Sequence, residues 1–325
     1  MSKPKVFVTR EIPEVGLKLV VDNTDAEVWP DLLPPPYEVI KEKIASCDGL
    51  LALLTDKIDA PLLDAAPNLK VVSNFAVGFN NIDVAAATAR RIRVGNTPGV
   101  LTEATSDFAF TLLMGGARRL VEACNYAKAG HWQTWEPQGF LGQDIWGATM
   151  GIVGMGRIGY AMAHRAHRGF DMRILYYDVN PSEHAERDFG ATRVDMDTLL
   201  AEADFVSIHT DLNASTTGLI NRDTLAKMKR NAILINSARG PIVDTDALYE
   251  ALRDGVIAGA AMDVTEPEPL PVEHPLYSLP NCTIAPHIAS ATYTSRNKMA
   301  RMAAENLLAG LRGEDLPNQV NPEVG

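Results

Sequence analysis

The glycine-rich run GMGRIG at residues 154–159 restricts the fold of this chain more than any other feature of its sequence. The apolar run GIV before it has the pattern of a buried strand, and the run IGYAMAHRA that overlaps its end has the pattern of a helix. Three glycines at this spacing between a strand and a helix are typical of a dinucleotide-binding turn. The motif therefore predicts a Rossmann-type, doubly wound parallel sheet.

Each glycine of this run has a separate expected role. Gly154 permits the tight turn, Gly156 lets the backbone approach a pyrophosphate, and Gly159 lets the helix meet the strand closely. The helix N-terminus supplies N–H donors and the positive end of the helix dipole, so Arg157 and Ile158 are also expected to bind the cofactor. Glycines recur in purely structural turns as well, but the flanking strand and helix favour nucleotide binding.

The acidic residue after the next strand bears on the identity of the nucleotide. The strand expected at 173–177 ends at Asp178, about 20 residues beyond Gly159. A carboxylate there accepts hydrogen bonds from the adenosine ribose hydroxyls and repels a 2′-phosphate. No Arg or Lys stands in the run 179–182 that follows. These residues favour NAD over NADP, the alternative being an Asp that only caps a turn.

Alternating strands and helices predict two α/β domains. Six apolar runs fit the strands of a dinucleotide-binding domain, at residues 150–153, 173–177, 205–209, 232–236, 258–262 and 282–285. The first hundred residues also alternate strands (5–9, 27–29, 49–54 and 69–73) with helices (15–21 and 37–46). Such alternation predicts a second parallel sheet.

Two long helices are expected near the boundaries of these domains. One begins at Thr102, a candidate N-cap, and its apolar run continues to about residue 127. The other spans about 292–311, ends at the C-cap Gly313 and would pack back on the first domain. The expected division is a discontinuous substrate domain, residues 1–100 and 288–325, and a coenzyme domain, residues 101–287.

Polar residues follow three late strands, at the sheet edge where parallel sheets bind ligands. Arg239 follows the strand at 232–236, and His287 follows the strand at 282–285. Glu266 and Glu268 both follow the strand at 258–262, which comes between those two strands in the sequence. An Arg fork matches a carboxylate, a His can protonate a developing alkoxide, and a carboxylate on the far ring nitrogen would orient that His. Singly these could be an ion pair, a loop charge and a strand-end cap; together they favour keto-acid reduction.

The runs around these residues resemble the D-isomer-specific 2-hydroxyacid dehydrogenases over nearly the whole chain. The motifs that carry the resemblance are NSARGPIVD at 236–244, DVTEPEP at 263–269 and PHIAS at 286–290, together with GMGRIG. The resemblance implies a Rossmann coenzyme domain with a smaller, flavodoxin-like substrate domain built from both termini. It also implies Arg239 as substrate anchor, His287 as acid/base and Glu268, rather than Glu266, as its partner.

The same resemblance extends to further binding positions. The run NFAVGFNNID at 74–83 is similar to the loop whose backbone N–H groups, at Val77 and Gly78, hold the substrate carboxylate. Leu53 and Ser290 are further substrate-binding positions. The remaining cofactor contacts implied are Thr105, His209, Ser237, Ala238 and Asp263, of which Asp263 would bind the nicotinamide carboxamide. Two departures are Asp211-Leu212-Asn213, where the family usually has Pro-Leu-Thr, and Thr265, where it usually has an aromatic residue.

The Trp-rich segment 130–147 resembles that of glyoxylate and hydroxypyruvate reductases. In that subgroup a Trp at the position of Trp135 reaches the neighbouring subunit's active site, where it would shorten the pocket and suit acids of two or three carbons. The segment is also too apolar for a solvated loop, which predicts a homodimer. The alternative for Trp135 is a buried anchor of the dimer interface.

Composition excludes several other classes of protein. A net charge of −11 argues against nucleic-acid binding and against an anionic membrane surface. No stretch approaches the roughly 20 apolar residues of a membrane span, and the start of the chain has no apolar signal segment. Three separated cysteines suit a reducing cytoplasm, and His164 and His167 alone are weak evidence for a metal, so no metal is expected.

Two alternatives to a glyoxylate or hydroxypyruvate reductase remain open at this point. One is a dehydrogenase for 3-phosphoglycerate or another D-2-hydroxy acid. The other is an NAD-sensing protein like the transcriptional corepressors of the same family, which bind partner peptides. A phosphite dehydrogenase is disfavoured, because residues 71–83 contain no Lys to hold a doubly charged anion.

Overall fold

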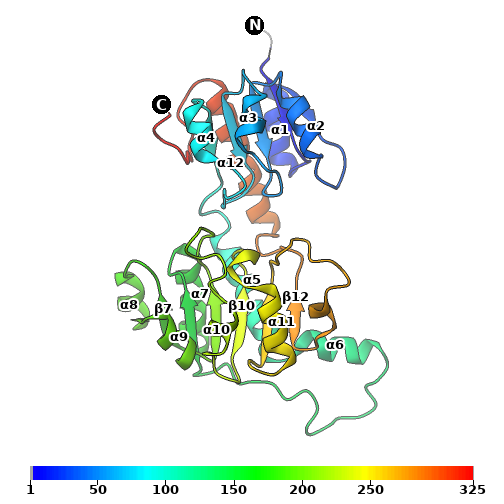
Figure 1. Cartoon of the computed structure of the whole chain (residues 1–325), viewed down its shortest axis with the longest axis vertical. Coiled ribbons are helices and arrows are strands. Elements are labelled where there is room, and N and C mark those ends of the chain that lie inside the picture. Colours follow the sequence, from blue (N-terminus) through cyan, green and yellow to red (C-terminus); the bar gives the residue numbers. More distant parts are fainter. Residues whose placement is uncertain (1–2, 325) are drawn as a thin grey trace. The chain divides into compact units, whose positions relative to one another are not determined.

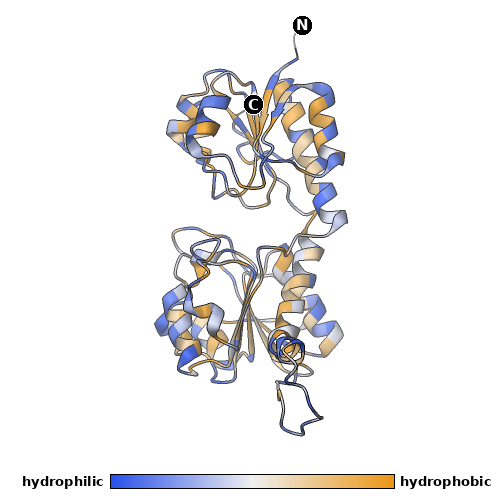
Figure 2. Ribbon diagram, turned by 90° about the vertical axis from the view of Figure 1, so that its right-hand side faces the viewer, coloured by the Kyte–Doolittle hydropathy of each residue, from blue (hydrophilic) through white to orange (hydrophobic). Residues whose placement is uncertain are grey.

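The chain passes from one folding unit to a second and then returns. Unit 1 comprises Met1–Leu101 and Ala291–Gly325, and unit 2 comprises Thr102–Ser290. The computed structural model describes residues 3–324 (Figure 1). Figure 2 shows apolar residues gathered on the strands and on the helix faces that cover them. Within the described residues, no helix is both long and apolar enough to cross a membrane.

Unit 1 is built on a five-stranded parallel sheet in the order β2-β1-β3-β4-β5. This is the flavodoxin-like strand order, as expected. The strands are β1 (Lys5–Val8), β2 (Asp25–Val28), β3 (Gly49–Ala52), β4 (Val71–Asn74) and β5 (Arg93–Gly95). The helices are α1 (Glu14–Asn23), α2 (Tyr37–Ile44), α3 (Ala60–Asp64), α4 (Val84–Ala89) and α12 (Tyr293–Leu311).

Helix α12 returns from the far end of the sequence to complete unit 1. It packs against α1 and against β3, β4 and β5. The approach to α1 is so close that a Cβ atom at Gly16 would lie 2.3 Å from the carbonyl oxygen of Ala300. At its N-terminus the Thr292 side chain accepts from the Ser295 N–H, and the chain leaves α12 through Gly313 at a φ of 76°. The residue after the cap thus takes the left-handed conformation that glycine tolerates best.

Unit 2 is a seven-stranded, all-parallel sheet in the order β12-β11-β10-β9-β6-β7-β8. Its strands are β6 (Thr149–Val153), β7 (Arg173–Tyr177), β8 (Thr192–Arg193), β9 (Phe205–Ile208), β10 (Ile233–Asn236), β11 (Gly259–Met262) and β12 (Cys282–Ile284). The direction of winding reverses between β6 and β9, which is the topological switch point of a doubly wound sheet. The predicted fold class is confirmed, with one strand more than the six predicted: β8, of only two residues.

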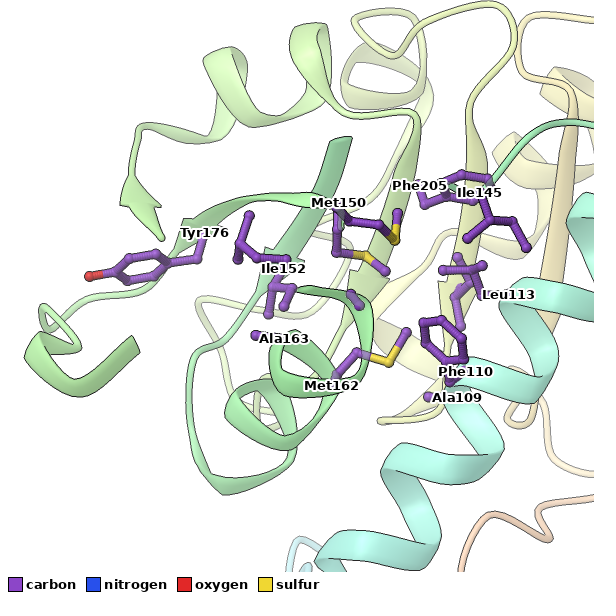
Figure 3. Close-up of a cluster of buried hydrophobic side chains, with 14 of the residues drawn as sticks. Ala109, Phe110, Leu113, Ile145, Met150, Ile152, Met162, Ala163, Tyr176 and Phe205 are labelled. Atoms are coloured by element: carbon purple, nitrogen blue, oxygen red, sulfur yellow. The ribbon is translucent and has the colours of Figure 1, made fainter. Parts of the chain in front are cut away.

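Helices cover both faces of the sheet of unit 2. The helices of this unit are α5 (Thr102–Ala117), α6 (Leu120–Lys128), α7 (Arg157–Phe170), α8 (Glu183–Phe189), α9 (Met196–Glu202), α10 (Arg222–Leu225) and α11 (Thr245–Arg253). Figure 3 shows Phe110 and Leu113 of α5 meeting Met150 of β6 and Met162 of α7. Burial of these side chains holds α7 against the sheet. Since α7 begins at Arg157, within the glycine-rich run, this packing also positions that turn.

The long helix predicted from Thr102 to about residue 127 is two helices. Arg119 takes a left-handed conformation with a φ of 50°, which separates α5 from α6. The free carbonyl of Ala117 at the end of α5 accepts instead from the Gln143 N–H at 2.9 Å. Thr102 is the first residue of α5 rather than its cap. Helix α6 has no buried residue and lies on the outside of unit 2 (Figure 1).

Candidate active site

The glycine-rich motif and the polar motifs that follow the strands of unit 2 lie at the carboxyl ends of those strands. Because all seven strands are parallel, the residues that follow β6, β7, β9, β10, β11 and β12 lie along one edge of the sheet. In order along the chain these are Gly154, Asp178, His209, Arg239, Asp263 and His287. The fold therefore gathers on one edge residues that are far apart in the sequence.

The imidazole of His287 is paired with Glu268. Its Nδ1 lies 2.5 Å from Oε1 of Glu268, and the two side chains are 24% and 34% exposed. Glu266, the competing carboxylate, is exposed, and its backbone carbonyl accepts from the Thr245 hydroxyl at 2.7 Å. With Nδ1 engaged by Glu268, Nε2 is the ring nitrogen left to face a substrate oxygen.

Asp263 fixes the turn that carries His287. Its two carboxylate oxygens accept from the N–H groups of Ile288 and Ala289, each at 2.8 Å. Its backbone carbonyl accepts from the His287 N–H at 2.9 Å, and His287 has a φ of 53°. Burial raises the pKa of the Asp263 carboxyl, and the two N–H donors oppose that shift. Asp263 was expected to contact the nicotinamide. The hydrogen bonds of its carboxylate are with the turn after His287, at Ile288 and Ala289.

Arg239 is held by a tight turn after β10. Asn236 donates to the Arg239 carbonyl at 2.9 Å and accepts from the Ala238 N–H at 3.0 Å. Gly240 lets this turn touch the next loop, since a Cβ atom there would lie 1.9 Å from the Thr265 carbonyl oxygen. Burial lowers the pKa of the Arg239 guanidinium, while the carboxylates of Glu268 and Asp211 raise it. Arg239, Glu268 and His287 thus form one electrostatic group, in which the arginine stays charged.

The glycine-rich turn has the space that a phosphate requires. Gly154 has a φ of 95°, and a Cβ atom there would lie 2.7 Å from the Thr210 nitrogen. At Gly159 a Cβ atom would lie 2.1 Å from the Gly154 carbonyl oxygen. At Gly156, by contrast, a Cβ atom would meet nothing within 4 Å, so the space beside it is open. Arg157 begins α7, whose first N–H groups have no side-chain cap.

Other predicted cofactor residues differ in their surroundings. The Ser237 hydroxyl is buried and has no hydrogen-bond partner among the described residues. His209 is paired through Nε2 with the Ser207 hydroxyl at 2.8 Å, and burial lowers its pKa to about 4. Thr105 is buried on α5, and its neighbour Ser106 donates to the Ile158 carbonyl at 3.3 Å. The orphaned Ser237 hydroxyl and the open side of Gly156 fit a bound dinucleotide.

Asp178 contacts the glycine-rich turn directly. Its carboxylate accepts from the Met155 N–H at 2.8 Å and from the Asn180 N–H at 3.0 Å. Arg193, from β8, donates to the carbonyls of Asp178 at 2.9 Å and Val179 at 2.8 Å. The run 179–182 holds no Arg or Lys, as the sequence shows, but the sheet brings Arg193 to this turn from a strand too short to predict.

Known proteins resemble this chain along its full length. The sequence profile of the D-isomer specific 2-hydroxyacid dehydrogenase, NAD binding domain, matches residues 110–289. A glyoxylate reductase of Korarchaeum cryptofilum is 53% identical over 323 residues, which cover 99% of this chain and 97% of that protein. One from Thermococcus kodakarensis is 49% identical over 326 residues, with 99% and 97% covered. The chain belongs to the D-isomer-specific 2-hydroxyacid dehydrogenases.

Solved structures of the family agree with the fold. A protein of Thermus thermophilus has a TM-score of 0.91 and 47% identity, covering 97% of this chain and 99% of its own. An NADPH-dependent glyoxylate/hydroxypyruvate reductase of Sinorhizobium meliloti, in complex with NADP and malonate, has a TM-score of 0.86 and 32% identity, with 99% and 98% covered. The resemblance inferred from the motifs is therefore confirmed.

In this dehydrogenase the expected substrate loops lie at the carboxyl edge of the sheet of unit 1. Leu53 follows β3 directly, and Val77 and Gly78 follow β4. All three residues are partly buried. Ser290, the fourth expected residue, is the last residue of unit 2 and is also partly buried. Their roles toward substrate stay predictions.

The segment with Trp135 lies away from the catalytic residues of its own unit. Residues 129–148, between α6 and β6, form an arm in which Trp132, Trp135 and Trp146 are 72%, 81% and 70% exposed. Gln143 of the arm donates to the carbonyl of Asn231, just before β10. The arm also borders a cavity of about 300 Å³ lined by the amino-terminal ends of β10 and β11. It thus adjoins the sheet edge opposite the one that carries Arg239 and His287.

Metal ligation has no support in the described part of the chain. Across residues 3–324, no group of three or more His, Cys, Asp or Glu side chains is arranged to hold a metal ion. His164 and His167, both on α7, instead lie near the ring of Phe189, at 5.9 and 6.0 Å between centroids. These histidines pack against an aromatic side chain.

Proposed function

We propose that this dehydrogenase reduces glyoxylate and hydroxypyruvate to the corresponding 2-hydroxy acid with NADH, giving the D isomer where the product is chiral. The observation that carries the proposal is the group of Arg239, Glu268 and His287 at the carboxyl edge of unit 2, along the same edge as the glycine-rich turn. Relatives that are about half identical over their full length are named glyoxylate reductases. Unit 2 would hold the coenzyme, and the loops of unit 1 would contribute to substrate binding.

Each residue of the group has a proposed role in the reaction. The Arg239 fork binds the substrate carboxylate and polarises the neighbouring carbonyl. His287 donates a proton from Nε2 to the carbonyl oxygen as it becomes an alkoxide. Glu268 holds the imidazole by Nδ1, so that Nε2 faces the substrate and the imidazolium is stabilised. In the reverse direction neutral His287 takes the proton back.

The coenzyme would be held along the edge from β6 to β11. Gly156 and the N-terminus of α7 fit the pyrophosphate, Asp178 the adenosine ribose and the orphaned Ser237 hydroxyl a polar group of the coenzyme. When bound, the nicotinamide ring supplies the hydride that reduces the substrate carbonyl. We propose NADH as the preferred coenzyme, because Asp178 repels a 2′-phosphate.

We further propose a homodimer formed through the arm. Its three exposed tryptophans, with Leu141 at 66% exposure, leave an apolar surface that a second copy of the chain would cover. Trp135 would then reach the active site of the other copy and limit the length of the substrate. Three free cysteines, Cys47, Cys124 and Cys282, suit the reducing cytoplasm in which we propose that the enzyme works.

A panel of 2-oxo acids with NADH and NADPH tests the proposed function. We expect glyoxylate and hydroxypyruvate to give the highest kcat/KM, read as loss of NADH absorbance. Turnover of only bulky 2-oxo acids, or of a phosphorylated acid, would indicate another dehydrogenase of the family. NADH binding without turnover of any acid would favour the NAD-sensing alternative.

A further inference from the structure

The backbone carbonyls of the three expected substrate positions in unit 1 share one environment. Each accepts a hydrogen bond from the side-chain amide of an asparagine of the same unit. The pairs are Asn81 to Leu53 at 3.1 Å, Asn96 to Val77 at 2.7 Å and Asn74 to Gly78 at 2.9 Å. A carbonyl held in this way fixes the plane of its peptide bond, and with it the direction of the N–H group of the following residue.

The N–H groups of Val77 and Gly78 are the ones left available. Within residues 3–324 neither has a protein acceptor. The Leu53 N–H, by contrast, donates to Asp56 at 2.7 Å, so Leu53 has no N–H to offer a substrate. A carboxylate at this edge would therefore meet two adjacent peptide N–H groups, those of Val77 and Gly78.

The planar peptide bond explains how these N–H groups are aimed. In a trans peptide the C=O of one residue and the N–H of the next point in opposite directions. The Ala76 carbonyl is held by the Thr97 N–H at 2.9 Å, which fixes the plane that carries the Val77 N–H. The Val77 carbonyl is held by Asn96, which fixes the plane that carries the Gly78 N–H. Asn96 thus sets the direction of the second donor.

Asn96 is itself held firmly. Its backbone carbonyl accepts from the side chain of Asn306 on α12 at 2.9 Å, and its N–H donates to Asn318 at 3.2 Å. Asn306 is fully buried and accepts from the Asn318 N–H at 3.0 Å. The C-terminal part of unit 1 therefore anchors the residue that orients the Gly78 N–H.

A second pair of asparagines joins the two loops. Fully buried Asn74 donates to Asn81 at 3.1 Å as well as to the Gly78 carbonyl. Asn81 also donates to the Asp56 carbonyl at 3.1 Å, in the loop after β3. The loops after β3 and β4 are therefore joined by side-chain hydrogen bonds, and Gly78 is fixed on both its peptide planes.

We propose that Asn96, with Asn74 and Asn81 in support, is a positioning residue that aims the Gly78 N–H, beside the Val77 N–H, at the substrate carboxylate. The proposal rests on the proposed function, which places that carboxylate at these N–H groups. Since the asparagines are uncharged and act through the backbone, their loss should weaken substrate binding without removing the proton donor His287. Coenzyme binding, which is assigned to unit 2, should be unaffected.

The test compares Asn96→Ala with a matched control, Asn321→Ala. Asn321 is 1% exposed, and its side chain accepts from the Val94 N–H and donates to Thr88 and to the Ile92 carbonyl in the same unit, so its loss costs at least as many hydrogen bonds as the loss of Asn96. We expect Asn96→Ala to raise the KM for glyoxylate and the Ki of the non-reacting analogue oxalate by about tenfold each. kcat should change less, and the KM for NADH should stay unchanged in both variants.

Three outcomes decide the matter. If the wild type reduces no 2-oxo acid, the proposed function fails and the inference fails with it. If the wild type is active but the KM and Ki of Asn96→Ala match those of Asn321→Ala, the inference alone is overturned. If Asn96→Ala does not fold, Asn74→Ala removes the donor on the other side of Gly78, and the same rise in KM and Ki is required of it.

Discussion

The carboxyl edges of the two sheets offer different chemistry to a ligand. In unit 2 the edge carries charged and titratable side chains, with Arg239, Glu268 and His287 acting on one another. In unit 1 the edge offers backbone N–H groups whose directions are set by uncharged amides, as at Asn96. In the proposed mechanism, the group that changes charge, His287, and the charged anchor Arg239 belong to unit 2, whereas unit 1 adds fixed peptide dipoles to the binding of the same anion.

Loss of the proposed proton donor of unit 2 should have the largest effect on catalysis. We expect His287→Ala to lower kcat for glyoxylate by on the order of a hundredfold or more. The KM for glyoxylate should change little, because Arg239 and the N–H pair of unit 1 remain. Steady-state kinetics measure both constants, and a kcat within a factor of a few of the wild type would remove His287 from the proposed role.

Replacement of the anchor should affect binding and chemistry together. Arg239→Lys keeps the positive charge but loses the fork that matches a carboxylate. We expect a higher KM and also a lower kcat, because the same group polarises the carbonyl. A change in KM alone would mean that Arg239 binds the substrate without acting on the reacting carbonyl.

The partner of His287 has a matched control two residues away. Glu268→Gln removes the charge that lies 2.5 Å from Nδ1, whereas Glu266→Gln alters an exposed side chain. We expect Glu268→Gln to lower kcat by about tenfold or more, since the imidazolium loses its stabilising charge, and Glu266→Gln to leave kcat unchanged. Equal effects of the two substitutions would contradict the assigned pair.

Much of this arrangement could be predicted from the sequence, and the exceptions have physical causes. The long apolar runs predicted β7 with its observed bounds and the other long strands to within a few residues, and the strand-end motifs predicted Arg239, Glu268 and His287. Short elements such as β8 leave too little periodic pattern to detect. Arg193 and Asn96 act through contacts made only in the folded sheet, and a loop asparagine by itself predicts no partner.

Coenzyme choice tests whether unit 2 selects by charge as well. Asp178→Ser removes the carboxylate that repels a 2′-phosphate but leaves Arg193 on the same turn. We expect the preference for NADH over NADPH in kcat/KM to narrow. In the double variant Asp178→Ser/Arg193→Gln, the preference for NADH should narrow less than in Asp178→Ser, because the arginine that would attract the 2′-phosphate is gone. A wild type that prefers NADPH would overturn the role assigned to Asp178.

The smallest expected effect concerns stability at acid pH. His209 has a pKa of about 4 in the folded chain because it is buried, below the roughly 6.5 of an unfolded chain. The unfolded state therefore binds more protons between these values, so folding loses stability as pH falls from about 6.5 toward 4. We expect His209→Gln to lose less melting temperature than the wild type over that range. Parallel pH curves for the two proteins would show that His209 does not titrate in this way.

The most direct test of the central claim is the product made from hydroxypyruvate. The family to which the chain belongs is specific for D isomers, and the proposed mechanism uses one proton donor, His287, held by Glu268, and one anchor, Arg239. Incubation with NADH followed by chiral separation of the product measures both activity and stereochemistry. The account predicts D-glycerate; L-glycerate, a racemic mixture or no turnover of hydroxypyruvate and glyoxylate would contradict it.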